Sequence, residues 1–356
     1  MRRSDLAVRS HFGVRGLAKL VTVSGLLIGL AGCNAVLLSP SGDMAVRQRD
    51  LIIIATCLMM LIIVPVITMT LVFAFRYRET NKEATYNPDW DHSTTLELGI
   101  WAAPLLIIIA LGAVTWVSTH QLDPYRPLTH IDERRPVPPG TQPLTVEVVA
   151  LDWKWLFLYP DLGIATVNEL AAPVDQPIRF KITASAVMNS FFIPALAGQV
   201  YAMPGMETKL HAVINRAGVY DGFSANYSGA GFSHMRFKFH GMSNDDFARW
   251  VAKTKADGTQ LSRDKYVNLA KPSESEPVQH FASVAPGLYD AILNRCVEGG
   301  TCRADVMALD ATRGKFDPSA YVCTASNTTG LDAALNPPAV AGDAVADALG
   351  NRRLVR

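Results

Sequence analysis

The sequence predicts a membrane α plus all-β protein. A two-helix transmembrane hairpin comes first, a small β sandwich or barrel follows, and a short helical C-terminal segment comes last. Hydrophobic residues make up 49% of the 356 residues, and most of the excess lies near the N-terminus. Two stretches there have no charged residue and are long enough to cross a bilayer as helices. Beyond them, short segments alternate between apolar and polar residues, which is typical of strands.

The N-terminus has the features of a secretory signal. Basic residues, among them Arg2 and Lys19, precede a short apolar run that ends in small residues. The run ends at Leu30-Ala-Gly-Cys33, which resembles the box where bacterial lipoprotein signals are cut. We therefore expect residues 1–32 to be a lipoprotein signal peptide and Cys33 to be the lipid attachment site. The alternative is that the run is an uncleaved anchor.

The two charge-free stretches form the hairpin that we expect within residues 33–120. They lie at about residues 51–75 and 98–117. Backbone groups inside lipid must bond within their own segment, so both stretches are predicted to be helices. With Cys33 anchored outside the cytoplasm, two crossings return the chain to the same side. The loop at residues 76–95 then faces the cytoplasm, and its positive charges agree weakly with this topology.

A change of pattern marks the start of the β domain. Residues 121–143 are rich in proline and are predicted to form an extended, stiff connector. Residues 144–242 then contain strand-like alternation, clearest in residues 145–151, 178–183, 208–214 and 235–239. Turn signals lie between these segments, which predicts one compact β domain.

The pattern becomes helical in residues 243–325. Residues 244–253 begin with acidic side chains and end with lysine, which suits the helix dipole. Residues 283–296 are a second candidate helix. Residues 326–356 are poor in large apolar side chains, and we predict a disordered tail there.

The five cysteines divide by compartment. Cys57 lies in the first predicted span, where it is expected to be a small apolar filler. Cys296, Cys302 and Cys323 would face an oxidising compartment, in which disulfides persist. Cys296 and Cys302 are close enough in sequence to form a disulfide, which would leave Cys323 free. The sequence alone does not establish the pairing.

The charge of the chain limits its partners. The formal net charge is +1, and the sequence contains no basic run. Nothing therefore favours nucleic acid as a partner on electrostatic grounds.

Four motifs resemble those of subunit II of haem-copper oxidases. Glu97-Leu-Gly-Ile-Trp-Ala-Ala-Pro104 resembles the Glu-x-x-x-Trp-x-x-Pro pattern of that family, and Asp152-Trp-Lys-Trp155 resembles its aromatic segment. The segment at 187–194 resembles the copper-site strand, and the segment at 219–235 resembles the second copper loop. The resemblance implies that residues 144–242 form a cupredoxin-like Greek-key domain.

Two further features indicate which branch of the family the sequence resembles most. Tyr201-Ala-Met-Pro-Gly205 and the lipoprotein box are most like the bo-type ubiquinol oxidase branch of the family. The resemblance covers roughly residues 30–300. Each motif alone has low specificity, whereas the set together has high specificity.

The departures from the family pattern affect the metal site. In cytochrome c oxidases this region binds two coppers through two thiolates, two imidazoles, a thioether and a backbone carbonyl, and soft thiolates are essential to it. The matching positions here are Asn189 and Phe232 for the imidazoles, Ser224 and Ser228 for the thiolates, Asn226 for the carbonyl and Met235 for the thioether. We therefore predict a degenerate copper site, with no metal and no other cofactor in this chain.

The resemblance implies a place in a respiratory complex. Without a copper relay, ubiquinol would deliver electrons directly to haem-copper oxidase subunit I. That partner holds the haems and copper, reduces oxygen to water and moves protons outward. We expect this chain to be a non-catalytic subunit II, bound to subunit I and smaller membrane subunits. Its place would be the bacterial inner membrane, among membrane lipid, with the β domain in the periplasm.

Glu97 is the residue with the strongest implied role. In the family, the matching glutamate stands at the mouth of a proton channel that opens in the catalytic subunit. Ionisable groups near the apolar part of a span are costly and tend to mark pathways. We expect Glu97 to help form a proton uptake site, and the alternative is an interfacial carboxylate that faces water.

Other interpretations remain open at this stage. The chain could be the copper-carrying subunit II of a cytochrome c oxidase, or a free envelope or assembly lipoprotein. Trp153 and Trp155 are expected to serve packing or an interface rather than electron transfer. A replacement metal site is disfavoured because strand alternation puts some of the candidate ligands on opposite faces. Those candidates are His211, His234, His240, Met203, Met206 and Met235.

Overall fold

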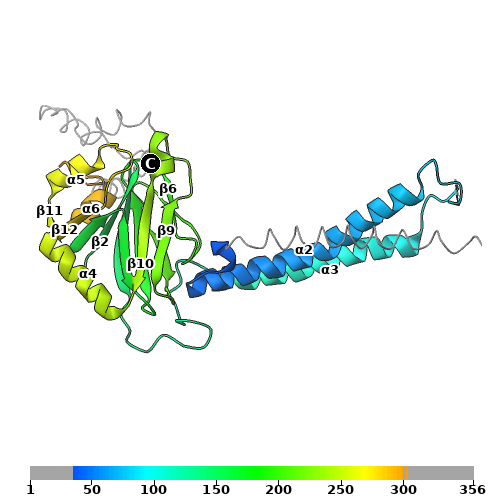
Figure 1. The fold of residues 1–356 in the computed structure, drawn as a ribbon, viewed down its shortest axis with the longest axis horizontal. Helices are drawn as coiled ribbons and strands as arrows, with labels where there is room; N and C mark the ends of the chain where they lie inside the picture. The colour runs from blue at the N-terminus through cyan, green and yellow to red at the C-terminus, as the bar shows by residue number, and fades with distance from the viewer. Residues whose placement is uncertain (1–34, 86, 88, 300–301, 304–356) are drawn as a thin grey trace, which may run out of the picture.

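The computed structural model describes residues 35–85, 87, 89–299 and 302–303. Figure 1 shows a long two-helix arm that projects from one side of a β domain, with the C-terminal helices on the far side of that domain. The predicted signal peptide, the lipid site at Cys33, the tail at 326–356 and Cys323 all lie outside the described residues.

The arm consists of two long apolar helices. A short 3-10 helix η1 (Val36–Leu38) precedes α2 (Asp43–Arg76), and α3 (Thr94–Gln121) returns along it. Both helices have the length and composition needed to cross a membrane, which agrees with the predicted hairpin. They extend beyond the predicted spans, because polar turns at their ends continue the helical hydrogen bonding.

The helices pack closely only near the β domain. In α2, the half-buried side chains Leu51, Ala55, Leu58 and Ile62 recur on one helical face. Every residue of α2 beyond Ile62 is exposed, and the two helices separate toward the loop that joins them. Pro65 lies in this half, where it removes a backbone donor from the helix.

The near end of the arm is built into the β domain. The backbone N–H of Gly42 donates to the Ala195 carbonyl at 2.9 Å, and the N–H of Asn215 donates to the Ser41 carbonyl at 2.9 Å. Met44 of α2 belongs to the buried core of the β domain. The hairpin is therefore joined to the domain by backbone hydrogen bonds and by packing.

The β domain is a sandwich of two sheets. One sheet has seven strands in the order β11-β12-β3-β2-β1-β5-β8, and the other has five in the order β4-β10-β9-β6-β7. Strands β11 (Thr259–Leu261) and β12 (Gln279–Val284) come from the C-terminal segment. The first ten strands are β1 (Leu144–Leu151), β2 (Lys154–Tyr159), β3 (Ile164–Val167), β4 (Glu169–Pro173), β5 (Ile178–Ala184), β6 (Asn189–Phe192), β7 (Val200–Ala202), β8 (Thr208–Ala212), β9 (Gly218–Ser224) and β10 (Arg236–Met242). These strands confirm the predicted cupredoxin-like β domain.

Aromatic side chains fill the space between the sheets. Trp155 and Phe157 of β2 meet Phe191 of β6 and Phe237 of β10. The rings of Phe191 and Phe237 are stacked with centroids 5.5 Å apart. Burial of this much apolar surface holds the two sheets together without any metal.

The C-terminal segment adds two strands to the seven-stranded sheet. Its first helix packs against the core between the sheets, and its other helices cover the outer face of the seven-stranded sheet. It contains α4 (Asn244–Asp257), β11 (Thr259–Leu261), α5 (Arg263–Ala270), β12 (Gln279–Val284) and α6 (Leu288–Leu293). Its side chains, including Tyr266 and Leu288, form a second core with Leu156 and Leu158 of β2. Strand β2 is therefore buried on both faces, so the molecule has three layers there.

This segment differs from the prediction in several of its elements. Helices were expected at residues 244–253 and 283–296, but the helix α5 and the two strands β11 and β12 were not expected. Ser283 belongs to β12 rather than to a helix, and the helix α6 begins only at Leu288. Strand β12 forms because it pairs with β3, a neighbour far away in the sequence, and local periodicity does not reveal such a partner.

The connector between the arm and β1 is also less extended than predicted. The backbone N–H of Ile131 donates to the Arg135 carbonyl at 2.8 Å, which turns the chain back on itself. The Asn215 side chain donates to the Ile131 carbonyl at 2.9 Å, and Arg135 pairs with Asp175 at 2.8 Å. The connector is tied to the β domain at both of these points.

Candidate functional site

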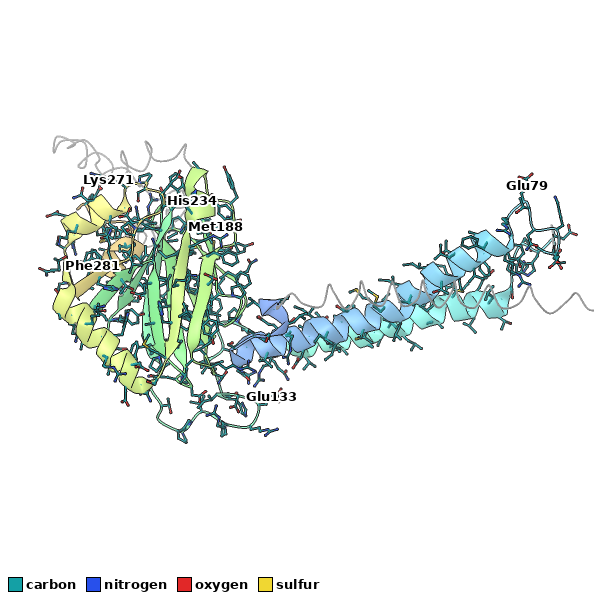
Figure 2. All side chains as sticks on the ribbon, in the orientation of Figure 1. Glu79, Glu133, Met188, His234, Lys271 and Phe281 are labelled. Carbon is teal, nitrogen blue, oxygen red and sulfur yellow. A yellow bond between two sulfur atoms is a disulfide. The ribbon has the colours of Figure 1, made fainter. Side chains whose placement is uncertain are left out.

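The positions that match the copper ligands gather at one end of the strands of the five-stranded sheet. Asn189 is the first residue of β6, and Ser224 is the last residue of β9. These two strands pair antiparallel, with Phe191 opposite Ser224. The loop after β9 contains the 3-10 helix η2 (Ala230–His234) and leads into β10. Figure 2 shows Met188 and His234 together at this end of the domain.

Polar oxygens and nitrogens at this end of the strands bond to one another. The Ser224 hydroxyl donates to the Asn189 side-chain carbonyl at 3.0 Å and lies 3.3 Å from the Asn226 carbonyl. The Asn189 amide donates to the Val187 carbonyl at 3.0 Å. Asn189 and Ser224 are both buried, so these bonds satisfy groups that would otherwise be costly.

Met235 keeps the thioether of the family pattern, and it lies in the core. Its side chain is fully buried among the aromatic residues between the sheets. Its backbone carbonyl accepts a hydrogen bond from the Ser224 N–H at 3.2 Å. A thioether is a weak acceptor, and here it fills apolar space.

The two remaining positions are held by aromatic contacts. The Phe232 ring is half-buried and meets the Tyr227 ring edge-on, with centroids 5.8 Å apart. The Ser228 carbonyl accepts a hydrogen bond from the Trp153 indole at 3.1 Å. Among the described residues, the buried Ser228 hydroxyl has no hydrogen-bond partner.

Trp153 packs against the loop between β9 and β10. A Cβ added at Gly231 would come within 2.5 Å of the indole, and one added at Gly229 within 2.9 Å. The indole therefore packs flat against these two glycines, which leave no room for a larger side chain. Trp155 is instead fully buried in the core. Both tryptophans serve packing in this structure, as predicted.

The donor set does not fit a two-copper centre. The six positions offer hydroxyl and amide oxygens, a phenyl ring and one buried thioether, with no thiolate and no imidazole. Copper centres of this kind need soft thiolate ligands. Within the described part of the chain, no cluster of three or more His, Cys, Asp or Glu residues could hold a metal ion. The candidate ligands His211, His234 and His240 are therefore not assembled into such a cluster.

Glu97 lies at the opposite end of the molecule. It is in the first turn of α3, and its backbone N–H donates to the Ser93 carbonyl at 2.8 Å. Its side chain is exposed. This turn is at the end of the arm far from the β domain, beside the loop in which Figure 2 marks Glu79.

The cysteines that the structure describes have two different surroundings. Cys296 and Cys302 form a disulfide, with sulfur atoms 2.04 Å apart. The next residue, Arg303, donates to the Gly205 carbonyl at 2.8 Å, so the end of the C-terminal segment contacts the loop before β8. Cys57 is exposed on α2 and does not fill a gap within this chain, contrary to the prediction.

Lys154 is an important residue that the sequence did not reveal. It lies between the two tryptophans of the aromatic motif, and it is only 1% exposed. Its ammonium donates to the Lys271 carbonyl at 2.9 Å and to the Ser273 hydroxyl. Burial lowers the pKa of this ammonium, while the carboxylate of Glu276 at 3.9 Å opposes that effect.

A second unforeseen group joins the two sheets near α4. The Glu169 carboxylate lies 3.2 Å from the His240 imidazole of β10 and 2.5 Å from the His280 imidazole of β12. The only signal for it in the sequence is the presence of two histidines on segments that alternate like strands. Their common partner is set by the tertiary fold.

Comparison with known proteins places the chain in a family. The family model for the periplasmic domain of cytochrome c oxidase subunit II matches residues 162–241, and the model for the COX aromatic rich motif matches residues 255–300. A curated relative from Pseudomonas putida, cytochrome bo(3) ubiquinol oxidase subunit 2, is 52% identical over 271 residues. That match covers 76% of this chain and 83% of the relative.

The chain belongs to the ubiquinol oxidase subunit 2 family, within the haem-copper oxidase subunit II proteins. Ubiquinol oxidase subunit 2 of Acetobacter aceti is 46% identical over 302 residues, which cover 84% of this chain and 94% of that protein. A crystal structure of the periplasmic domain of cytochrome oxidase subunit II from Bradyrhizobium japonicum matches with 24% identity and a TM-score of 0.31. That match covers 32% of this chain and 94% of the other.

Membership explains the division of this subunit II into parts. The first model covers most of the β domain, including the degenerate copper loop. The second covers the segment that carries β11, α5, β12 and α6 and packs on the outer face of the seven-stranded sheet. The chain is thus a membrane-anchored subunit of a ubiquinol oxidase, a haem-copper oxidase complex.

Proposed function

We propose that this chain is a copper-free, non-catalytic subunit II and that ubiquinol delivers its electrons directly to the partner subunit I. One observation carries the proposal: the Ser224 hydroxyl bonds to the Asn189 side chain at the place where a thiolate and an imidazole would bind copper. Hydroxyl and amide oxygens are poor ligands for such a centre. The haems and copper of the complex then belong to subunit I.

The proposal includes a place for each part of the chain. Cys33 carries a lipid, both helices cross the bacterial inner membrane, and the β domain lies in the periplasm. Two features support this arrangement. The start of α2 and the end of α3 both adjoin the β domain, and the loop at residues 77–93 is at the far end of the arm. A chain anchored at Cys33 returns to the same side of the membrane after two crossings.

The proposal also gives Glu97 a role in proton uptake. In this topology Glu97 lies at the cytoplasmic end of α3, the side from which a proton-pumping oxidase takes protons. The carboxylate is exposed and comes just before the apolar part of the span. An ionisable group at that depth is well placed to pass protons to a channel in a neighbouring subunit.

Purification of the complex in mild detergent tests this function. We expect the chain to remain stoichiometric with a haem-bearing membrane subunit, and the complex to consume oxygen with ubiquinol but not with reduced cytochrome c. Metal analysis and spectroscopy of the chain freed from its partner should give no purple copper absorption and no mixed-valence spin signal. Turnover with cytochrome c, or stoichiometric copper in the separated chain, would refute the proposal.

A further inference from the structure

Three side chains form a row across the seven-stranded sheet, close to the base of the arm. Arg179 of β5 is opposite Thr145 of β1 on one side and opposite His211 of β8 on the other. The next residues along β5 and β8, Phe180 and Leu210, belong to or pack in the core between the sheets. Because side chains alternate along a strand, the row lies on the outer face of the seven-stranded sheet.

This row is at the level of the lipid headgroups. The backbone N–H of His211 donates to the Pro124 carbonyl at 3.1 Å, so the row adjoins the chain just after α3. The charge-free part of the span ends at Val117, and the helix continues to Gln121, about 6 Å further. Headgroups extend roughly 5–7 Å beyond the hydrocarbon on each side of a bilayer. The end of α3 and the strands beside it therefore meet the headgroup layer.

The row carries a positive charge that has no acidic partner. The Arg179 guanidinium donates to the Thr145 hydroxyl at 2.9 Å, and its Nε–H is buried without an acceptor among the described residues. Within the described part of the chain, Arg179 forms no ion pair. A guanidinium in this state gains most from an anion that brings its own acceptor oxygens.

The carboxylates on this side of the sheet have other partners. In the next row of the same face, Lys181 is 3.7 Å from the Glu147 carboxylate and 3.9 Å from that of Glu207. The Asp123 carboxylate, at the end of the arm, accepts a hydrogen bond from the Tyr125 N–H at 2.9 Å. The second row is therefore neutralised by acids, whereas the first row keeps its charge.

The environment of His211 agrees with an uncompensated charge. Burial lowers the pKa of its imidazole, and the positive charges of Arg179 and Lys209 lower it further. No acidic group among the described residues opposes this effect. An anion beside the guanidinium would relieve the repulsion between these basic groups.

We propose that the row of Thr145, Arg179 and His211 binds the phosphate of an anionic phospholipid, of which phosphatidylglycerol is an example. The Arg179 guanidinium is planar, and its N–H donors match two phosphate oxygens. A zwitterionic lipid would also bring an ammonium group, for which the row offers no carboxylate. Bound lipid would hold the outer face of the sheet against the membrane surface, where anionic lipids attract basic residues. The inference goes beyond the proposed function and does not depend on the electron donor.

Photolabelling of the intact complex in lipid nanodiscs tests the site. The discs consist of phosphatidylcholine with a small share of a phosphatidylglycerol probe whose headgroup carries a diazirine, and labelled peptides are mapped after illumination. We expect label on β5 or β8, and much less label from a phosphatidylcholine probe that carries the same group. Unlabelled phosphatidylglycerol should compete for the site, whereas inorganic phosphate should not.

Substitutions of arginine test the role of the guanidinium. Arg179→Gln should lower the labelling about fivefold, the effect expected for one basic residue at an anionic membrane surface. Arg179→Lys keeps the charge and should retain most of the label. Arg263→Gln removes an exposed arginine of α5, on the far side of the domain from the arm, and should label like the wild type. The complexes are compared at equal haem content, so that loss of assembly does not count as loss of binding.

Three results would overturn this inference. The first is equal labelling of these strands by the anionic and the zwitterionic probe. The second is competition by inorganic phosphate that is as strong as competition by the lipid. The third is no label on either strand, which would mean that protein rather than lipid covers the row. Each of these comparisons uses the wild-type complex, so the inference is decided even if Arg179→Gln does not assemble.

Discussion

Ser224 and Asn189, at positions that match copper ligands of the family, hydrogen-bond to each other, which helps the loop keep its shape. Ser224 both accepts a hydrogen bond from the Ser190 backbone at 3.4 Å and donates to Asn189. Each bond of this kind contributes about 1 kcal/mol, and an unpaired buried group would cost more. The loop therefore needs no metal, provided that both polar partners are present.

At Glu97, the proposed role predicts a kinetic defect without a structural one. Glu97→Gln removes the charge and keeps the size of an exposed side chain, so the complex should still assemble. Proton uptake through this site would slow, and turnover with ubiquinol should fall by about tenfold. This is less than the roughly 10²- to 10⁴-fold effect of a group that transfers a proton at the reacting bond, because Glu97 would only deliver protons to a channel. Oxygen uptake by purified complex measures this. Glu79→Gln in the adjoining loop is the control, and wild-type turnover in Glu97→Gln would exclude the role.

Glu147 predicts a pH-dependent contribution to stability. Burial raises the pKa of this carboxyl to about 6 from an ordinary value of 4.5, and Lys181 at 3.7 Å opposes the shift. Between these two values the folded state binds a proton that the unfolded state has released, so stability falls as the pH rises through this window. The penalty is complete above about pH 6.

The change Glu147→Gln should remove that penalty. Near neutral pH we expect the free energy of unfolding to rise by about 1–2 kcal/mol, and the gain should vanish below about pH 4.5. Lys181 keeps a partner in the variant, because Glu207 lies 3.9 Å from it. Denaturant unfolding of the purified chain at several pH values measures the effect. Glu274→Gln, at an exposed position before β12, should change nothing, and a gain that does not depend on pH would contradict the argument.

Among the elements, the aromatic motif before and within β2 connects three parts of the fold. Trp153 packs against the loop between β9 and β10, and Trp155 lies in the core between the sheets. Lys154 donates a hydrogen bond to the turn before β12. The Ser273 N–H also donates to the Asp152 carbonyl at 3.0 Å. Four consecutive residues thus hold the loop, the sandwich and the C-terminal segment in one arrangement.

Removal of the Lys154 ammonium should loosen the C-terminal segment. In Lys154→Met the Lys271 carbonyl and the Ser273 hydroxyl lose their buried donor, which should lower the free energy of unfolding by about 1–3 kcal/mol. Hydrogen exchange should become faster for amides at residues 271–276. Lys209→Met is the matched control, because that lysine is on the exposed side of β8. Unchanged protection of residues 271–276 would show that the ammonium does not hold this turn.

For the whole molecule, the junction between the arm and the β domain sets how the two are oriented. Gly42 is the residue before α2, and its backbone lies close to the β domain. A Cβ added there would be 2.7 Å from the carbonyl oxygens of both Leu196 and Val213. Those oxygens belong to the backbone and cannot turn aside as a flexible side chain would. The close approach therefore requires glycine.

Gly42→Ala should consequently tilt the arm or strain the junction. We expect a loss of about 1–3 kcal/mol in stability, as for other overpacked sites, and less chain recovered with the haem-bearing partner. Thermal unfolding and the ratio of this chain to haem after purification measure the two effects. Gly99→Ala, where an added Cβ meets nothing within 4 Å, should match the wild type. Equal recovery of both variants would mean that the junction tolerates the shift.

The sequence by itself determined the two apolar helices, the existence of a β domain and which side chains stand at the positions that match copper ligands. Each of these follows from local information. A charge-free stretch is apolar whatever surrounds it, and a serine at position 224 supplies no thiolate in any fold. The identity of a side chain limits what it can ligate, and Asn189 and Phe232 therefore argue against copper before any coordinates are known.

Only the tertiary structure decided which strands pair and which side chains contact each other. Strand β2 is buried on both faces because the C-terminal segment adds a third layer, and β12 forms because β3 is beside it. Lys154 looks like a surface residue in sequence, yet its partners lie more than a hundred residues away. Hydrogen bonds and burial depend on neighbours in space. Periodicity and composition describe only neighbours along the chain, so they do not identify these partners.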